Sequence, residues 1–537
     1  MALPPRKILL VVTTGGFTHA APVLDVAKVL ADRGHTIEFA TLNGQGHYIA
    51  NYPFVSKLHL LGEGPTEQQY EEHYLRMRRW NPDYPLAGAM PSKYMFDSFW
   101  PVAYHGLKKI MDDPADRPDF IFGDFFVDAI KDMHIQYKTP IAMMFPQMPA
   151  LMFPCSYIPG ESGFQLPGTT TSENASMWLR IKNELVVVMG LPTILPFFRW
   201  TKNMRRQHGV KYSFPSHSKP DYLVFINSFF GLEPPRDLPP MAAAIGPILS
   251  DEYALLDEAC RKFLVAHENV IYVALGTHVI LSGNDTAKII TGVLQLLDDK
   301  VIDGVIWAVS KNGRQDMDRN HCFTDRQGTV HNLGDLLDGK NPSWLFPFFA
   351  PQRAVLAHES TKLFFTHGGG SSANEGVYHG KRMLTMGVFF DQVANMERLV
   401  HGGVAEPLHK FYFTPDELYT KARRVLEDKD GKYSRNSLRM QRIAHVASRR
   451  KYHAADLIEE VLYDNELRLQ DGRELRPMHL QTADMRMPTY KARNWDLKAA
   501  TILSMGAIGC SLGLVAKYAW RNRTIIQQAV SSVQSRA

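Results

Sequence analysis

A glycine-rich turn between an apolar strand and a helix, inside the segment 349–392, constrains the fold of this chain most. The run Thr361–Phe365 predicts a buried strand, and His367 is followed by glycines at 368–370 before a helix expected from Ser371. Glycines keep side chains away from the turn, so a ligand can approach its backbone N–H groups closely. Free N–H groups at a helix N-terminus attract anions. The segment therefore predicts a phosphate site in an α/β fold.

The N-terminal region predicts a second strand–turn–helix unit. The sequence predicts a buried strand over Ile8–Val12 and a turn over Thr13–Gly16. A helix is expected to start at Pro22 and to end at Gly34, and the next strand is expected over Thr36–Thr41. This β-α-β order is typical of a doubly wound parallel sheet. The turn lacks the G-x-G-x-x-G pattern of dinucleotide-binding folds, so an NAD(P) oxidoreductase is the less favoured function.

The segment 349–392, FAPQRAVLAHESTKLFFTHGGGSSANEGVYHGKRMLTMGVFFDQ, resembles the donor-binding signature of the UDP-glycosyltransferase family. The phrases FFTHGG, YHG and FFDQ are similar to the animal branch, the UDP-glucuronosyltransferases. Phe349 stands where the family usually has tryptophan, and Ser371 where the plant branch has asparagine. Together with the C-terminus described below, the chain resembles a fungal-like member with a membrane anchor. The resemblance implies a GT-B fold, in which two Rossmann-like doubly wound domains face a cleft.

The resemblance also implies which residues bind a UDP-sugar. The donor contacts it implies are Phe349 and Gln352 for uracil, Glu375 for ribose, Thr277, His367, Gly369, Gly370, Ser371 and Ser372 for the diphosphate, and Asp391 and Gln392 for the sugar. Gln392 favours glucose over galactose in this family, while glucuronic acid and N-acetylglucosamine stay open. UDP-glucose is therefore the expected co-substrate, with no cofactor and no metal.

His19 is the candidate catalytic base. It lies in the first βα loop, at the edge of the sheet where ligands bind in open α/β folds. An imidazole with a pKa near 6.5 can take the proton of an attacking hydroxyl. The resembled family places a histidine here and an aspartate at the end of a nearby strand, a position that Asp124 matches after the strand Phe120–Phe122. Asp128, which falls in a predicted helix, is the alternative partner.

Length and composition require more than one core, because the chain has 537 residues and 45% hydrophobic content. We expect an acceptor-binding domain over 1–240, a UDP-sugar-binding domain over 241–440, a helix crossing back to the first domain over 441–470 and a linker over 471–497. The segments 51–104 and 147–219 are expected as long irregular loops, and their many aromatic and methionine residues favour a hydrophobic acceptor pocket.

The C-terminal region predicts a single transmembrane helix over 498–520. Ala499–Ala516 holds no charged residue, and at about 1.5 Å per residue it spans roughly 27 Å, close to the hydrocarbon thickness of about 30 Å. A buried or surface helix is the alternative. No apolar stretch of signal-peptide length precedes the first strand, so we expect an endoplasmic-reticulum anchor with the catalytic domains in the cytosol.

These observations predict an inverting, metal-independent UDP-glycosyltransferase, a hexosyltransferase acting on a phenolic, flavonoid, sterol or terpenoid hydroxyl. The net charge of +5 is spread along the chain without a basic tract interleaved with aromatics, so nucleic acid is not an expected partner. A non-catalytic membrane-bound nucleotide-sugar binding protein or scaffold is the alternative from another class. It would be supported if His19→Ala retained full transfer activity.

Overall fold

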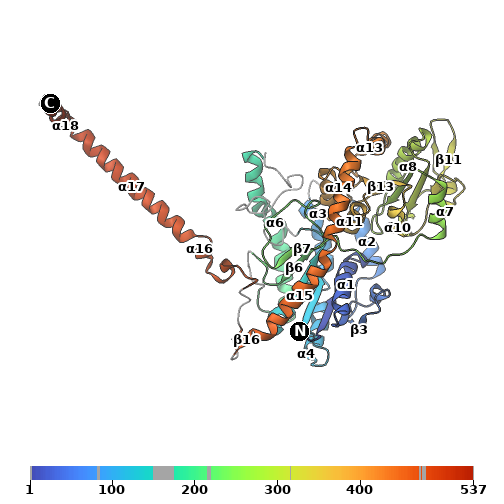
Figure 1. Cartoon of the computed structure of the whole chain (residues 1–537), viewed down its shortest axis with the longest axis horizontal. Helices are drawn as coiled ribbons and strands as arrows, with labels where there is room; N and C mark the ends of the chain where they lie inside the picture. The colour runs from blue at the N-terminus through green and yellow to red at the C-terminus, as the bar shows by residue number, and fades with distance from the viewer. Residues whose placement is uncertain are drawn as a thin grey trace. The chain divides into compact units, whose positions relative to one another are not determined.

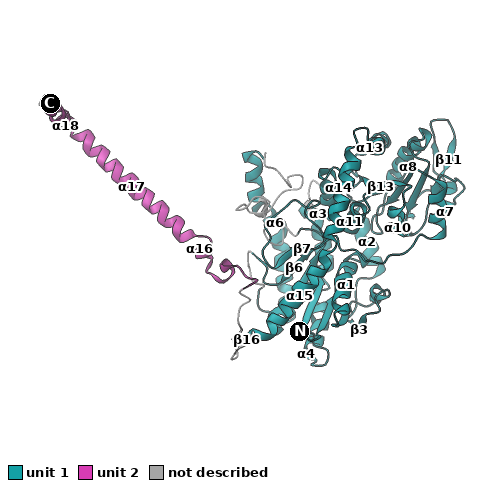
Figure 2. Ribbon diagram, viewed as in Figure 1, with its two compact units in different colours: residues 1–475 teal, residues 476–537 magenta. Residues whose placement is uncertain are grey.

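The computed structural model describes residues 3–81, 85–148, 175–213, 219–314, 316–470, 473–474 and 479–535. They form two compact units, Met1–Leu475 and Arg476–Ala537 (Figure 2). The first unit contains two parallel β-sheets flanked by helices, which confirms the predicted α/β class (Figure 1). Nothing in the structure fixes the predicted domain bounds, which stay predictions.

The first sheet has seven parallel strands in the order β3-β2-β1-β4-β5-β6-β7. Its central strands are apolar and buried along their whole length, as expected for a sheet covered by helices on both faces. The strands are β1 (Lys7–Val11), β2 (Thr36–Thr41), β3 (Val55–Leu60), β4 (Phe120–Asp124), β5 (Ile141–Phe145), β6 (Leu223–Ile226) and β7 (Ala242–Ala244). The last strand, β7, lies just past residue 240, so this sheet extends slightly beyond the predicted first domain.

The second sheet has six parallel strands in the order β12-β9-β8-β13-β14-β15. They are β8 (Val270–Ala274), β9 (Gly304–Ala308), β12 (Trp344–Leu345), β13 (Thr361–Thr366), β14 (Arg382–Thr385) and β15 (Ala405–Pro407). Two short hairpins stand apart, β10 (Cys322–Thr324) with β11 (Val330–Asn332), and β16 (Leu469–Gln470) with β17 (Arg473–Glu474).

Helices fill the connections between the strands. Those of the first sheet are α1 (Phe17–Asp32), α2 (Glu67–Met77), α3 (Pro85–Asp97), α4 (Trp100–Asp112), α5 (Ala129–Tyr137) and α6 (Met177–Gln207). Those that follow are α7 (Glu258–Ala266), α8 (Gly283–Asp298), α9 (Leu333–Leu337), α10 (Gln352–Ala357), α11 (Gly370–Tyr378), α12 (Asp391–His401), α13 (Pro415–Glu427), α14 (Lys432–Ala447) and α15 (Arg450–Leu467).

The helix α15 returns from the second sheet to the first. It packs against α1, and Arg33 at the end of α1 pairs with Asp456 at 2.6 Å. Farther along, Arg6 pairs with Glu466 through an Nη2–Oε2 distance of 2.8 Å. The C-terminal helix of the first unit therefore joins the two halves of that unit.

Both sheets have a topological switch point, where the chain changes direction across the sheet. In the first sheet, β1 pairs with β2 on one side and β4 on the other, with Val11 opposite Gly123. In the second, β8 pairs with β9 and β13, with Ala274 opposite Thr366. Ligands of open α/β sheets bind where the loops leave these adjacent strands. The two switch points therefore locate the candidate site.

Three expectations about local structure were wrong. The helix α1 begins at Phe17, and Pro22 lies inside it. The segment 51–104 contains β3, α2, α3 and the start of α4 rather than one irregular loop. Within 147–219 the described part is dominated by α6, while residues 149–174 and 214–218 lie outside the described residues.

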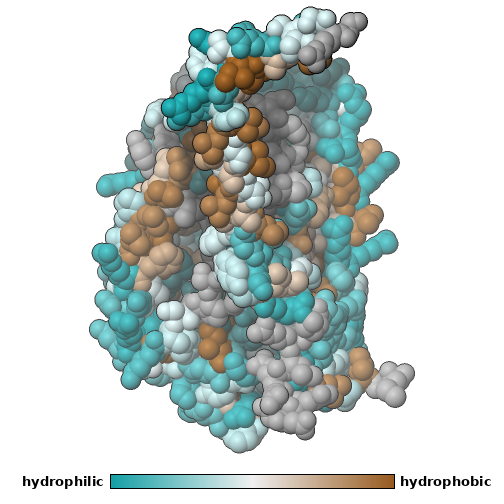
Figure 3. All heavy atoms as spheres, turned by 90° about the vertical axis from the view of Figure 1, so that its left-hand side faces the viewer, coloured by the Kyte–Doolittle hydropathy of each residue, from teal (hydrophilic) through white to brown (hydrophobic). Residues whose placement is uncertain are grey.

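The second unit consists of the helices α16 (Thr489–Ala492), α17 (Trp495–Arg521) and α18 (Arg523–Gln534). In α17 all residues are exposed or nearly so, and the helix is long and apolar enough to cross a bilayer. The 31-residue helix α6 passes the same test of length and composition. Apolar residues are exposed on the side of the molecule that Figure 3 shows. These features are compatible with the predicted anchor, although length and composition alone do not establish one.

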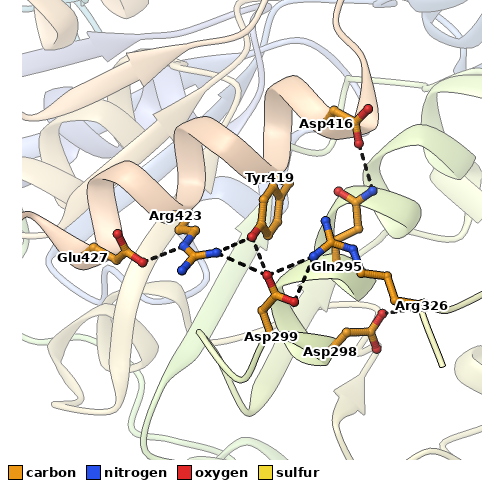
Figure 4. A network of polar contacts seen from close by, with 8 residues as sticks. All are labelled: Gln295, Asp298, Asp299, Arg326, Asp416, Tyr419, Arg423 and Glu427. Carbon is orange, nitrogen blue, oxygen red and sulfur yellow. Dashed lines mark hydrogen bonds and ion pairs between the residues drawn. The ribbon is translucent and has the colours of Figure 1, made fainter.

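A polar network holds α13 against the end of α8 (Figure 4). Arg326 contacts both carboxylate oxygens of Asp299 at 2.9 Å, and Arg423 contacts Asp299 at 3.3 Å. Gln295 donates to Asp416 at 3.0 Å. Exposed pairs of this kind contribute about 0.2 to 1 kcal/mol each, so the apolar α8–α13 contact dominates the packing here.

Candidate active site

His19 and Asp124 meet at the switch point of the first sheet. His19 lies in the first turn of α1, and Asp124 is the last residue of β4. The Nδ1 atom of His19 is 2.8 Å from Oδ1 of Asp124. The other carboxylate oxygen of Asp124 accepts from the N–H of Phe126 at 3.0 Å, which fixes the orientation of the carboxylate. The alternative partner, Asp128, instead pairs with Lys131 at 2.7 Å.

The environment of His19 favours its charged form. Burial lowers the pKa of His19, but the charge and hydrogen bond of Asp124, with a smaller contribution from Asp391, outweigh burial and raise it. Because Nδ1 faces the carboxylate, Nδ1 carries the proton and Nε2 is left as the basic nitrogen. The arrangement can therefore accept a proton at Nε2 and stabilise the resulting imidazolium.

Aromatic rings pack beside His19. Phe126 stacks on the imidazole with ring centres 4.8 Å apart, and Phe125 lies at 5.8 Å. Phe96 from α3 extends this wall, 4.9 Å from Phe126. A nonpolar wall next to a base suits a flat, hydrophobic ligand.

His367 lies at the switch point of the second sheet, directly after β13. It is packed against two glycines, since a Cβ on Gly276 would fall 2.6 Å from its Nε2 and one on Gly369 would fall 2.4 Å away. Burial lowers the pKa of His367 to about 4, so the ring is neutral. A hydrogen bond between the ring and the backbone of Ala274 opposes this effect of burial without reversing it. Only glycines fit these two positions, which explains part of the G-rich pattern.

Gln352, Ser372 and Glu375 form a connected polar group. Gln352 begins α10 and donates from Nε2 to Glu375 Oε2 at 2.7 Å, and it lies 3.3 Å from the hydroxyl of Ser372. Burial raises the pKa of Glu375, although the hydrogen bond from Gln352 opposes it. The structure thus brings together the residues predicted for uracil and ribose.

The N-terminus of α11 is placed as expected, with one difference. The helix starts at Gly370 rather than Ser371, and the N–H groups of Ser371 and Ser372 lie in its first turn, where no earlier helical carbonyl can accept them. The N–H of Gly370, however, donates to the carboxylate of Asp391. Asp391 also accepts from Asn395 at 3.2 Å. Gly370 is therefore tied to Asp391, and fewer N–H groups are left for an anion.

Gln392 is engaged within its own loop. Its Oε1 accepts from the N–H groups of Val388 and Phe389, both at 3.2 Å, so only its amide nitrogen is left for a sugar. Phe349 is 76% exposed, which leaves its ring face open to a base. Thr277 is exposed in the loop after β8, beside Gly276 with φ +82°.

Sequence reasoning missed His278, which lies between the two switch points. Its ring stacks on Tyr74 of α2 at 4.2 Å, and its Nε2 would be 3.3 Å from a Cβ on Gly16. Burial lowers the pKa of His278 to about 4, and proximity to His19 contributes. Its position directly after Thr277 in the β8 loop was the available signal.

Direct contacts hold the two halves of the site face to face. Asn374 of α11 donates to the carbonyl of Asn227, after β6, at 3.0 Å. Arg398 of α12 donates to Gln147, after β5, at 2.7 Å. The half that carries His19 and the half that carries the predicted donor residues are therefore in direct contact.

Comparison with known proteins identifies the family of the chain. Residues 130–450 match the family described as "UDP-glucoronosyl and UDP-glucosyl transferase". The UDP-glycosyltransferase FPY2 of Fusarium mangiferae is 41% identical over 95% of this chain and 98% of its own length.

Two solved structures share the fold. The glycotransferase of kitacinnamycin has a TM-score of 0.60 at 18% identity, covering 86% of this chain and 100% of that chain. A Polygonum tinctorium UDP-glucosyltransferase, described as capable of glucosylating indoxyl and solved with 3,4-dichloroaniline, has a TM-score of 0.56 at 19% identity with the same coverage. The fold is GT-B, and the chain belongs to the UDP-glycosyltransferase family of enzymes.

Proposed function

We propose that this enzyme transfers glucose from UDP-glucose to a hydroxyl group of a hydrophobic small molecule, with inversion at the anomeric carbon and without a metal ion. The observation that carries the proposal is the 2.8 Å contact between His19 and Asp124, with Asp391 close enough to help raise the pKa of His19. A base on one side and a leaving group on the other suit a single in-line displacement.

In the proposed step, Nε2 of His19 takes the proton of the acceptor hydroxyl while its oxygen attacks the anomeric carbon. The bond between that carbon and the β-phosphate oxygen breaks, and UDP leaves with the electron pair. Asp124 positions His19 and stabilises the imidazolium that forms, a function worth about 10² to 10⁴ in rate in comparable dyads. N–H groups at the start of α11 and the neutral ring of His367 would bind the departing diphosphate.

The acceptor class rests on the aromatic wall beside the base. Phe125 and Phe126 lie against His19 and would hold a flat phenol, flavonoid, sterol or terpenoid with its hydroxyl near Nε2. Glucose is one of the two sugars that the family description names, together with glucuronic acid, so the sugar panel in the test below includes both. Gln392 contributes less to a preference for glucose than its family role implies, because its oxygen is occupied.

The test incubates the full chain with a phenol panel and, in turn, UDP-glucose, UDP-galactose, UDP-glucuronic acid and UDP-N-acetylglucosamine. Proton NMR of the product should show a β-glucoside formed from UDP-α-glucose, with activity unaffected by EDTA. His19→Ala should abolish transfer while UDP binding persists, and the exposed His47→Ala serves as the matched control. An α-linked product, or unchanged transfer by His19→Ala, would contradict the proposal.

We also propose that α17 anchors the enzyme in the endoplasmic reticulum membrane with the first unit in the cytosol. The support is the length, composition and exposure of α17. Protease treatment of sealed microsomes should degrade the first unit. Protection of that unit would reverse the orientation, and release of the full chain by carbonate washing would exclude a spanning helix.

A further inference from the structure

A second cavity lies away from the donor residues, at the junction of the two halves of the first unit. Its volume is about 370 Å³, and its lining includes Tyr253, Arg353, Tyr378, His379, His445 and Lys451. These residues come from the segment after β7, from α10, from the end of α11, and from α14 and α15. The cavity is therefore lined by polar and aromatic groups from several elements that link the sheets.

Arg353 faces this cavity rather than the donor site. Its neighbour Gln352 contacts Glu375 and Ser372, whereas Arg353 donates from Nη1 to the carbonyl of Ser250 at 2.6 Å. Its guanidinium lies 4.1 Å above the ring of Tyr253. The Nε atom is buried and has no hydrogen-bond partner among the described residues. Arg353 therefore contributes its charge to the lining of the cavity, while its Nε atom is closed to the cavity space.

His379 presents a second donor of the same kind. Its Nε2 is buried without a partner among the described residues. Burial, with the charges of Arg353 and Lys381, lowers the pKa of His379 to about 4, so its ring is neutral and one nitrogen carries a proton. His379 therefore adds a neutral imidazole to a cavity lining that also holds the guanidinium of Arg353.

Lys451 supplies a buried cation to the same cavity. Its side chain is 7% exposed, and its Nζ lies 2.6 Å from Asp251, whose side chain is 79% exposed. Asp25 of α1 is also near enough to feel the charges of Lys451 and Arg353. An anion in the cavity would compete with Asp251 for Lys451, and the exposure of Asp251 lets it turn towards solvent.

We propose that this cavity binds a phosphate-type oxyanion between Arg353, His379 and Lys451. An arginine fork and an ammonium group are the donors that phosphate groups prefer in proteins. A free phosphate fills only part of the volume, and the rings of Tyr253 and Tyr378 line the cavity as well, so the phosphate group of a small organic molecule also fits. This site is separate from the donor site and does not depend on the proposed reaction.

Occupation of the site would connect the two halves of the first unit. Arg353 belongs to α10 beside the second sheet, while Lys451 belongs to α15, which packs on α1 of the first sheet. A ligand that binds Arg353 and Lys451 together would favour the arrangement of the two halves in which both side chains reach the ligand. Through Gln352, the same helix α10 also reaches the donor residues.

The test uses isothermal titration of the detergent-solubilised full chain with inorganic phosphate, pyrophosphate and phenyl phosphate, at constant ionic strength. All titrations contain saturating UDP, so that the donor site cannot take the probe. We expect saturable one-site binding, weakened at least tenfold by Lys451→Gln and by His379→Phe. Arg450→Gln removes an exposed charge one residue away and should bind as the wild type does.

The two variants change residues on different elements, so a folding defect in one does not affect the other. Thermal melting of each variant shows whether it has folded. Tighter binding of phenyl phosphate than of phosphate would assign an organic phosphate, and equal affinity would assign the free ion. An absence of saturable binding in these titrations, or binding that is equal in Lys451→Gln, His379→Phe and the wild type, would overturn the proposal.

Discussion

Replacing Gly15 by alanine tests whether the position of His19 controls the rate. Gly15 has φ +86°, and a Cβ there would lie 2.5 to 2.9 Å from three atoms of the His19 ring. Ordinary contact begins near 3.4 Å, so the ring must move by roughly 0.9 Å. Such a shift would move Nε2 away from its position for proton transfer and disturb the 2.8 Å contact with Asp124.

The size of the effect follows from two separate costs. A displacement of about 1 Å at a catalytic group lowers the rate by about 10²-fold, equivalent to about 2.7 kcal/mol in the activation barrier. The left-handed backbone adds about 1 to 2 kcal/mol of instability for any residue with a Cβ. The first cost appears in kcat and the second in the free energy of unfolding.

Gly34→Ala separates these costs. Gly34 has φ +95° at the end of α1, and no atom lies within 4 Å of its added Cβ. Both variants should lose similar stability in thermal melts and bind UDP with unchanged affinity, but only Gly15→Ala should lose about 10²-fold in kcat/KM. If the two variants retained kcat/KM within threefold of each other, the reasoning about His19 would be refuted.

Three further changes have defined outcomes. Asp124→Asn should lower kcat by about 10²- to 10⁴-fold. It should also move the acidic limb of the pH–rate profile to lower pH, because the carboxylate that raises the pKa of His19 is lost. An acidic limb at the same pH as in the wild type would contradict this. Gly369→Ala should weaken UDP binding about tenfold or more in titrations, because the added Cβ would fall 2.4 Å from Nε2 of His367. Gly369 does not have a positive φ, so this variant carries no added backbone strain. Truncation before Lys498 should release the protein from membranes into the soluble fraction, and continued sedimentation with membranes would show another attachment.

The sequence was most informative where structure is local. The strand β13, the glycine turn and the start of α11 follow from an apolar run and three glycines that are adjacent in the chain. The meeting of His19 with Asp124 was also predictable, because parallel strands on either side of a switch point bring their C-terminal ends to the same edge. The family resemblance then supplied the role of each residue.

Helix boundaries near proline were predicted poorly. Proline often begins a helix, so Pro22 was read as a start, yet α1 begins at Phe17 and includes it. The helix α6, which lies in the segment expected to be an irregular loop, contains Pro192 and Pro196. These two prolines are four residues apart, so they lie on the same side of the helix and its opposite side can keep its hydrogen bonds.

The contacts of His278 and Gly370 could not be read from the chain. Tyr74 and Gly16, which His278 contacts, are distant in sequence and come from the other sheet's connections. The bond between Gly370 and Asp391 likewise depends on how α11 and α12 pack. Such contacts are set by tertiary packing, which no local spacing encodes.

Electrostatics assign different tasks to the three histidines of the cleft. His19 has a carboxylate partner and a raised pKa, whereas burial lowers the pKa of His278 and His367 to about 4. Near neutral pH only His19 among them can hold a transferred proton at low energetic cost, while the other two stay neutral hydrogen-bonding groups. Titratable groups whose environments move their pKa values apart are the ones that divide acid–base roles. The pairing with Asp124 is therefore what distinguishes His19, the proposed base, from the two neighbouring histidines.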